Sequence, residues 1–429
     1  MKKLLAISLM VLLIGSFGFN SVLAKTVTLK FMGWEASPLE TKSVQEGLAR
    51  FMKENPDIKV EYTPVPGDQY ASKLLTMMAG KAAPDVFFLY AEGYYRDFQK
   101  RGVLLDLTGL FNESMKLNDF IPMDRQKMLI RGHIYGVSSC VVAPVLYYNK
   151  AVFDKAGLAY PPADPEEAWT WDQFVNISKK LTITDGAKTE QWGCYGFEIT
   201  PSREAVIYSN EGKIFNPSYT KTVFDKATQE ALQKIRDLKV KDKVSPSANF
   251  LQQSGMSAAQ MLQTGKVAMV ADGSWALQQL AKMNFPVGVG ALPKLKKPAT
   301  AGTAHLHCIW KETKYPKEAW KLLQFLSSED YQVNLVREGL WMPNRTSLYT
   351  AAGIKKWLNP AVHPKGFEKL VPYFTKDLLP TPSLFIPREA WDVCEEEFDR
   401  FFDDNQPLNK VVPSLRKRVD AILAANAAK

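Results

Sequence analysis

Paired cysteines and long apolar runs are scarce in this chain. Its 429 residues include four cysteines, Cys140, Cys194, Cys308 and Cys394, and no C-x-x-C pair occurs. This spacing disfavours a zinc cluster and leaves open whether the cysteines form up to two disulfides or stay as single buried thiols. Beyond the N-terminal segment no apolar run is long enough to span a bilayer. We expect the mature chain to be soluble.

Long runs of like charge and nucleotide-binding motifs are also missing. The chain has 54 basic and 45 acidic residues, but no basic helix with interleaved aromatics, which disfavours nucleic-acid binding. Gly288 and Gly290 lack the G-x-G-x-x-G pattern of a dinucleotide site, and no nucleophile elbow is present. His305 and His307 share a strand face, but two ligands do not make a metal site. We expect no nucleic-acid partner, cofactor, metal or catalytic residue.

The apolar run at the N-terminus has the composition of a secretory signal. Lys2 and Lys3 precede the apolar residues 4–13, and Val22 and Ala24 suit cleavage after position 24. An uncleaved membrane anchor is the alternative, although the run is short for a span. No cysteine follows the run, so we expect export without the lipid-anchoring cysteine of a bacterial lipoprotein.

The segment after the signal predicts a strand, a helix and a second strand. Apolar residues alternate from 26 to 34, where the strand ends in Trp34, and again from 58 to 62. Between these strands Ser37 and Glu40 suit a capping box, with Pro38 at the first helical position. Such units wind into a parallel sheet, and ligands bind at the carboxyl ends of its strands. Trp34 lies at one such end, and Tyr90 ends the next expected strand.

Residues 136–150 form a small-residue, β-favouring run that carries no charge before Lys150. Such a run is typical of buried extended chain. A mature chain of about 400 residues is too long for one compact core and suits two domains. We interpret the run as a crossing between two lobes, with Ser139 beside the cleft.

Several stretches together resemble the extracellular solute-binding proteins of ABC transporters, in the carbohydrate-binding group that includes maltose-binding protein. The resemblance rests on residues 51–60, 83–86, 102–108, 145–150, 273–275, 317–323 and 339–343, in the order of the family. It implies an α/β fold of two lobes, each a mainly parallel sheet flanked by helices, joined by three hinge crossings. The crossings are expected near residues 140–143, 302–305 and 339–344.

The resemblance also sets expected domain boundaries. A signal peptide would occupy residues 1–24. The first lobe would comprise residues 25–140 and be completed by about 304–341, and the second would comprise 141–303 and be completed by about 342–429. Both lobes would then be discontinuous in sequence.

Sugars present apolar ring faces bordered by hydroxyl groups, so a sugar site needs aromatic rings and hydrogen-bonding side chains. The resemblance implies that Trp275 stacks on the ligand. From the residues alone, Asp272 or Ser274 can cap a helix that carries Trp275 at its N-terminus. Arg345 could grip a carboxylate if the sugar were acidic. Each candidate has a plainer alternative as a core or surface residue. The expected ligand-binding set is Trp34, Tyr90, Glu92, Ser139, Tyr195, Glu198, Asn210, Trp275, His305, Trp341, Arg345 and Trp391.

The resemblance implies a periplasmic monomer that captures a mono- or oligosaccharide by hinge closure, without a chemical step, for a membrane-embedded ABC permease. Maltose itself is disfavoured, because the acidic ligand contact of maltose-binding protein aligns loosely with Val142. Two alternatives stay open. A secreted carbohydrate-active enzyme would need carboxylates such as Glu92 and Glu198 to meet across the cleft. A binding protein for a phosphorylated or amino-acid solute would need clustered arginines and helix N-termini.

Overall fold

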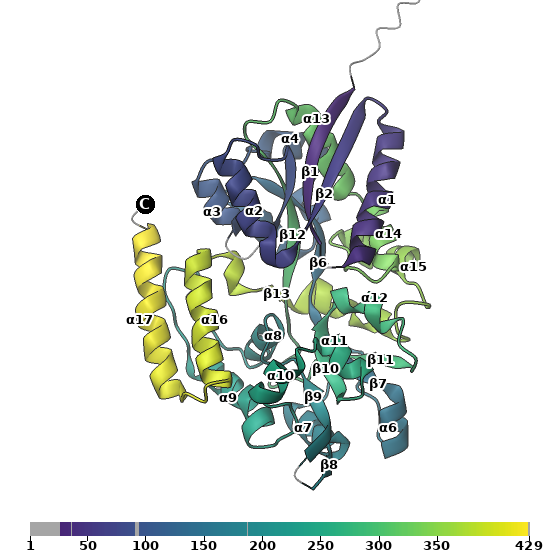
Figure 1. The fold of residues 1–429 in the computed structure, drawn as a ribbon, viewed down its shortest axis with the longest axis vertical. Helices are drawn as coiled ribbons and strands as arrows, with labels where there is room; N and C mark the ends of the chain where they lie inside the picture. The colour runs from purple at the N-terminus through teal and green to yellow at the C-terminus, as the bar shows by residue number, and fades with distance from the viewer. Residues whose placement is uncertain (1–25, 36, 91–93, 187, 428–429) are drawn as a thin grey trace, which may run out of the picture.

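The computed structural model describes residues 26–35, 37–90, 94–186 and 188–427. The expected signal segment and Glu92 lie outside the described residues, as does the side chain of Tyr90. Two β-sheets with helices around them form two lobes along the long axis of the molecule (Figure 1). The α/β class and the two lobes agree with the sequence-based expectation.

The regular elements alternate between strands and helices along most of the chain. The strands are β1 (Val27–Glu35), β2 (Ile58–Pro66), β3 (Val86–Tyr90), β4 (Leu129–Ile130), β5 (His133–Ile134), β6 (Gly136–Val142), β7 (Pro144–Asn149), β8 (Ile183–Asp185), β9 (Lys188–Tyr195), β10 (Val267–Gly273), β11 (Val287–Gly290), β12 (Thr300–Ile309) and β13 (Leu378–Pro380). The α-helices are α1 (Pro38–Glu54), α2 (Gly67–Ala79), α3 (Tyr94–Lys100), α4 (Thr108–Ser114), α5 (Pro122–Met128), α6 (Lys150–Ala156), α7 (Trp171–Leu181), α8 (Ser202–Ser209), α9 (Lys226–Val240), α10 (Ala248–Ser254), α11 (Ala258–Gln263), α12 (Leu277–Leu280), α13 (Pro316–Leu326), α14 (Glu329–Arg337), α15 (Ala351–Trp357), α16 (Arg388–Phe402) and α17 (Leu408–Ala427).

The first sheet begins with the β1–α1–β2 unit that the sequence predicts. Leu29 and Phe31 of β1 are buried, and β1 pairs in parallel with β2 on one side and β3 on the other. Helix α1 starts where expected, because the Ser37 side chain accepts a hydrogen bond from the Glu40 amide and Pro38 occupies the first turn. The sheet order is β13-β12-β3-β1-β2, and β6 pairs with β12.

The expectation that each lobe holds a mainly parallel sheet is wrong in detail. The second sheet has the order β11-β7-β10-β9-β8, and only its β9–β10 pair is parallel. In the first sheet β12 runs antiparallel to β3 and β6. Parallel pairing needs a long crossover connection, whereas β8 and β9 follow one another almost directly and therefore pair antiparallel.

Residues 136–149 pass from the first sheet to the second. Strand β6 pairs with β12 in the first sheet, and β7 pairs with β10 and β11 in the second. Both strands are buried along their whole length, as their composition predicts. Met342 exchanges two backbone hydrogen bonds of 2.9 Å with Val141, so the chain near 342 runs beside this passage. The number of hinges and the residue boundaries of the lobes stay predictions.

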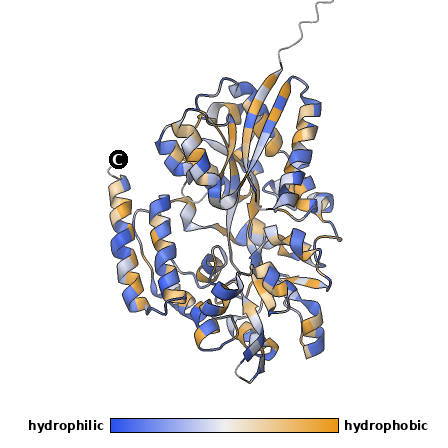
Figure 2. Cartoon of the chain, viewed as in Figure 1, coloured by the Kyte–Doolittle hydropathy of each residue, from blue (hydrophilic) through white to orange (hydrophobic). Residues whose placement is uncertain are grey.

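The helices cover the sheets with amphipathic faces. Figure 2 shows hydrophobic and hydrophilic residues interleaved along helices such as α16 and α17, which pack together beside the second lobe. Trp391 and Phe398 of α16 are buried in the core of that lobe. A capping box of Thr170 and Gln173 starts α7.

Candidate functional site

A cavity of about 580 Å³ is lined by residues that come from both sheets and from the segments that follow their strands. This volume lies within the range of small-molecule sites. The side chains that line it are Trp34, Ser37, Leu39, Glu40, Val142, Thr200, Pro201, Ser257, Ala259, Asp272, Trp275, Ala276, Gln278, Gln279, Lys282, Thr303, His305, Leu340, Trp341 and Thr381. The cavity therefore combines three indole rings with carboxylate, amide and hydroxyl groups.

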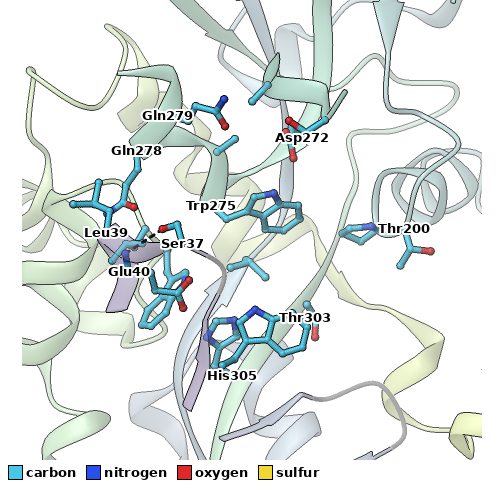
Figure 3. A pocket seen from close by; sticks show the side chains of 18 of the residues that line it. Ser37, Leu39, Glu40, Thr200, Asp272, Trp275, Gln278, Gln279, Thr303 and His305 are labelled. Atoms are coloured by element: carbon cyan, nitrogen blue, oxygen red, sulfur yellow. Dashed lines mark hydrogen bonds between the residues drawn. The ribbon is translucent and has the colours of Figure 1, made fainter. Parts of the chain in front are cut away.

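Trp275 presents the most open aromatic surface of the cavity. It is 40% exposed, whereas most large apolar side chains of the described chain are buried. Its indole donates a hydrogen bond to Asp272, and it lies so close to Gly273 that a Cβ there would be 2.1 Å from the ring. In Figure 3 the ring lies between Thr200 on one side and Ser37 on the other. The indole is held in place while its surface remains open.

Asp272 is the last residue but one of strand β10 and has an unusual environment for a carboxylate. Its Oδ1 accepts a 2.7 Å hydrogen bond from the Gly273 amide. Burial raises the pKa of Asp272 to about 6, against the lowering effect of the hydrogen bonds from Gly273 and Trp275. The expectation that Asp272 or Ser274 caps a helix is wrong: a short 3₁₀ turn, Ser274–Ala276, follows, and no side chain caps it.

Trp34, His305 and Trp341 form a second aromatic group in the cavity. The ring centroids of His305 and Trp341 are 4.7 Å apart in a T-shaped arrangement. Trp34 lies near the end of β1, and its ring centroid is 6.3 Å from that of Phe88. Gly67 gives Trp34 its space, since a Cβ at 67 would lie 2.3 Å from the indole. Burial holds the pKa of His305 well below its ordinary value, so its neutral ring has one donor and one acceptor nitrogen.

Four of the twelve expected site residues thus meet at one cavity: Trp34, Trp275, His305 and Trp341. Their contact with a ligand stays a prediction. Tyr90 and Glu92 cannot be placed, because the side chain of one and the whole of the other lie outside the described part of the chain.

Three polar candidates, Tyr195, Glu198 and Asn210, are not among the residues that line the cavity. Glu198 pairs with Lys239, with 3.4 Å between carboxylate and ammonium. The Asn210 amide donates to the Ala227 carbonyl at 2.7 Å. Tyr195 is 7% exposed and packs in a hydrophobic core. Whether any of the three contacts a ligand stays a prediction.

Three further candidates are also absent from the residues that line the cavity. Arg345 donates to the Ser327 carbonyl at 2.9 Å and lies 3.9 Å above the Phe120 ring. Trp391 is 1% exposed in the second-lobe core, and Ser139 is fully buried inside β6. Val142, at the end of the same strand, lines the cavity instead of Ser139.

The sequence reasoning missed several polar residues of the cavity, notably Glu40, Asp272, Gln278 and Gln279. Two signals could have found them. Glu40 belongs to the helix start directly after Trp34. Gln278 and Gln279 follow Trp275 by three and four residues, which is the spacing of neighbours on one helix face.

Comparison with known proteins decides the family. The profile of the family described as bacterial extracellular solute-binding protein matches residues 36–333. The chain belongs to this family. A Pyrococcus horikoshii relative, named as an uncharacterized ABC transporter extracellular-binding protein, is 24% identical over 316 residues, which cover 72% of this solute-binding protein and 71% of the relative.

Solved structures share the fold. An ABC substrate-binding protein from Listeria monocytogenes in complex with cycloalternan has a TM-score of 0.81 and 23% identity, covering 93% of this chain and 99% of its own. Maltose-bound T. maritima MalE3 has a TM-score of 0.74 and 22% identity, covering 92% and 99%. This solute-binding protein therefore has the two-lobed periplasmic-binding-protein fold. Its family serves transport and is not a family of enzymes.

Within the part of the chain that the structure describes, no helix has both the length and the apolar character needed to cross a bilayer.

Proposed function

We propose that this solute-binding protein captures a mono- or oligosaccharide in the cavity by closure of its lobes and delivers it to the permease of an ABC transporter. The observation that carries the proposal is the indole of Trp275, which is held in place by Asp272 and Gly273 and is 40% exposed, in a cavity that Trp34 and Trp341 also line. Indole faces stack on the apolar faces of sugar rings, and the carboxylates of Glu40 and Asp272 can accept hydrogen bonds from hydroxyl groups.

The relatives support the same ligand class. One structural neighbour holds cycloalternan, another holds maltose, and a third, from Bdellovibrio bacteriovorus, holds maltotriose. The proposed setting is the periplasm, with the chain exported by its N-terminal segment, free of a lipid-anchoring cysteine and monomeric. The proposed partner is the membrane-embedded permease.

The cavity favours a sugar over a phosphorylated or amino-acid solute. Arg345, the arginine expected to bind an acidic group, is engaged with Ser327 and Phe120. Among the described residues that line the cavity, Lys282 is the one permanently cationic side chain, against two carboxylates. An anionic ligand would therefore meet repulsion without clustered arginines to offset it.

A thermal-shift and calorimetry panel tests the proposal. It comprises maltose, maltotriose, cycloalternan and α-D-tagatose, with glucose 6-phosphate and glutamate as anionic comparisons. At least one sugar should raise the melting temperature in proportion to its concentration and leave the mixture chemically unchanged by chromatography. Stabilisation by the anionic compounds alone would replace the sugar proposal with a different solute, and cleavage of a sugar would contradict a pure binding role.

A further inference from the structure

The cavity wall formed by Thr200 and Pro201 is backed by a buried ion cluster. Arg203, in the first turn of α8, is 2% exposed, and Glu204 is fully buried. The Nη2 atom of Arg203 lies 2.8 Å from a carboxylate oxygen of Glu204 and 2.7 Å from one of Glu395 on α16. Thr200 and Pro201 line the cavity, whereas the three charged residues are not among its lining. The cluster lies directly behind the wall.

The guanidinium of Arg203 contacts two carboxylates and an aromatic ring. Its Nη1 donates to Glu395 Oε2 at 3.2 Å, and its Nη2 donates to Glu395 Oε1 at 2.7 Å, so the pair is bidentate. Its Nε donates to Glu204 Oε1 at 3.0 Å, and its carbon lies 3.8 Å from the centre of the Phe398 ring. A charge this deeply buried is tolerated only with such partners.

The Thr200 hydroxyl belongs to the same cluster. It donates to Glu395 Oε1 at 2.9 Å and accepts from Arg203 Nη2 at 2.5 Å; a Glu204 carboxylate oxygen lies 3.5 Å away. A hydroxyl has a single proton to donate, and this one is used by Glu395. Figure 3 shows the Thr200 oxygen pointing away from Trp275. The wall therefore turns its polar atom towards the cluster and its carbon atoms towards the cavity.

We infer that Glu395 is a positioning residue for carbohydrate binding, which holds Arg203 and the Thr200 hydroxyl so that the wall beside Trp275 stays apolar and rigid. None of the residues that line the cavity belongs to α16, so Glu395 acts through Thr200. Without Glu395 the hydroxyl loses its nearer acceptor and keeps only the long contact of 3.5 Å to Glu204, which leaves it able to rotate towards the cavity. Arg203 then keeps Glu204 alone as an ionic partner. The inference rests on the proposed function, because its effect is read as sugar affinity.

The first test compares neighbouring carboxylates on α16. Glu395→Ala removes the acceptor, Glu395→Gln keeps an acceptor oxygen, and Glu396→Ala is the matched control, because Glu396 pairs with Arg418 on the surface. Calorimetry with each panel sugar that binds the unmodified chain measures the dissociation constants. We expect a loss of about 5-fold to 20-fold for Glu395→Ala, in the range of coupled neighbouring residues, most affinity retained in Glu395→Gln, and no change in Glu396→Ala.

A double-mutant cycle with Thr200→Val separates positioning from general destabilisation. Because valine keeps the shape of threonine but cannot bond Glu395, Glu395→Ala should cost much less affinity in that background. Equal losses in both backgrounds, or no loss in the first, would overturn the inference. If Glu395→Ala does not fold, Glu395→Met, which keeps the volume without an acceptor, takes its place in the cycle.

Crystal structures without sugar give a readout independent of the proposed function. In the Glu395→Ala or Glu395→Met variant the Thr200 side chain should adopt a different rotamer from the unmodified chain. If no panel sugar binds the unmodified chain, the proposed function fails on that result. A Thr200 side chain that keeps its place in the variant would overturn the positioning inference separately.

Discussion

Replacing Trp275 by alanine should weaken sugar binding strongly. The side chain is 40% exposed, so a large part of its ring surface is open to a ligand. Its hydrogen bond to Asp272 and its close approach to Gly273 keep the ring in one place before a ligand arrives. A ring that is already ordered loses little conformational entropy on binding. The variant therefore removes a prepared stacking surface.

The expected magnitude follows from the open area of the ring. Tryptophan side chains have an area of up to about 250 Å², and an exposure of 40% leaves about 100 Å² open to a ligand. A sugar ring that covers between half and all of this area gains about 1.3 to 2.5 kcal/mol at about 25 cal/mol per Å². This free energy corresponds to a loss of about 10-fold to 70-fold in affinity.

Calorimetric titration of the panel sugars measures the effect, and Tyr160→Ala is the control. Tyr160 is an aromatic residue of similar exposure, 38%, but it is not part of the cavity lining. The Tyr160 variant should bind with unchanged affinity, while both variants keep a cooperative thermal transition. Affinity within twofold of the unmodified chain for Trp275→Ala, or an equal loss for Tyr160→Ala, would refute the stacking argument.

Three further predictions concern buried polar groups. Burial raises the pKa of Asp272 from 3.8 to about 6, so ionising this carboxyl group destabilises the folded chain. The destabilisation is absent below pH 4, increases between pH 4 and 6, and reaches at most about 3 kcal/mol at higher pH. Asp272→Asn should therefore raise the melting temperature more at pH 7.5 than at pH 4, and an equal shift at both would contradict this assignment. Lys127 and Asp124 form a buried ion pair, with 3.9 Å between the ammonium nitrogen and a carboxylate oxygen. Lys127→Met should lower the free energy of unfolding measured in urea by about 3–5 kcal/mol, and adding Asp124→Asn to the same chain should restore most of this loss. Lys42→Met, which breaks an exposed pair, should change the free energy of unfolding by less than about 1 kcal/mol. The four cysteines are free and buried, and burial raises the pKa of each thiol; a reducing agent should leave the melting temperature unchanged, and a fall would indicate a disulfide.

The sequence predicts the elements of the fold better than their pairing. Alternating apolar residues and the Ser37–Pro38 helix start locate β1 and α1 closely, because both signals are local. The direction in which β7 runs beside β10 is not a local property. It depends on how the passage from the first sheet enters the second, and the alternation of side chains is the same for either direction. The expectation of a mainly parallel sheet fails for the second lobe for this reason, whereas in the first lobe β1 pairs in parallel with both β2 and β3.

The candidate site shows a second limit, which concerns competition for polar atoms. Trp34 and Trp275 reach the cavity because an indole needs only one hydrogen-bond partner and offers a large face. Glu198 was as plausible from its place after an aromatic strand, but Lys239 of helix α9 pairs with its carboxylate. Whether a carboxylate is available to a ligand thus depends on residues that strand and helix patterns do not bring together.

Thr200 shows the same competition from the opposite side. It lines the cavity, yet its hydroxyl proton is used by Glu395, which lies 195 positions later in the chain. The residue contributes carbon surface where its type would suggest a hydrogen-bond donor. A site prediction from sequence therefore needs two separate answers: which residues the topology brings to the cavity, and which of their polar atoms remain uncommitted once the rest of the chain has folded around them. The first follows in part from strand ends, whereas the second follows only from the packed structure.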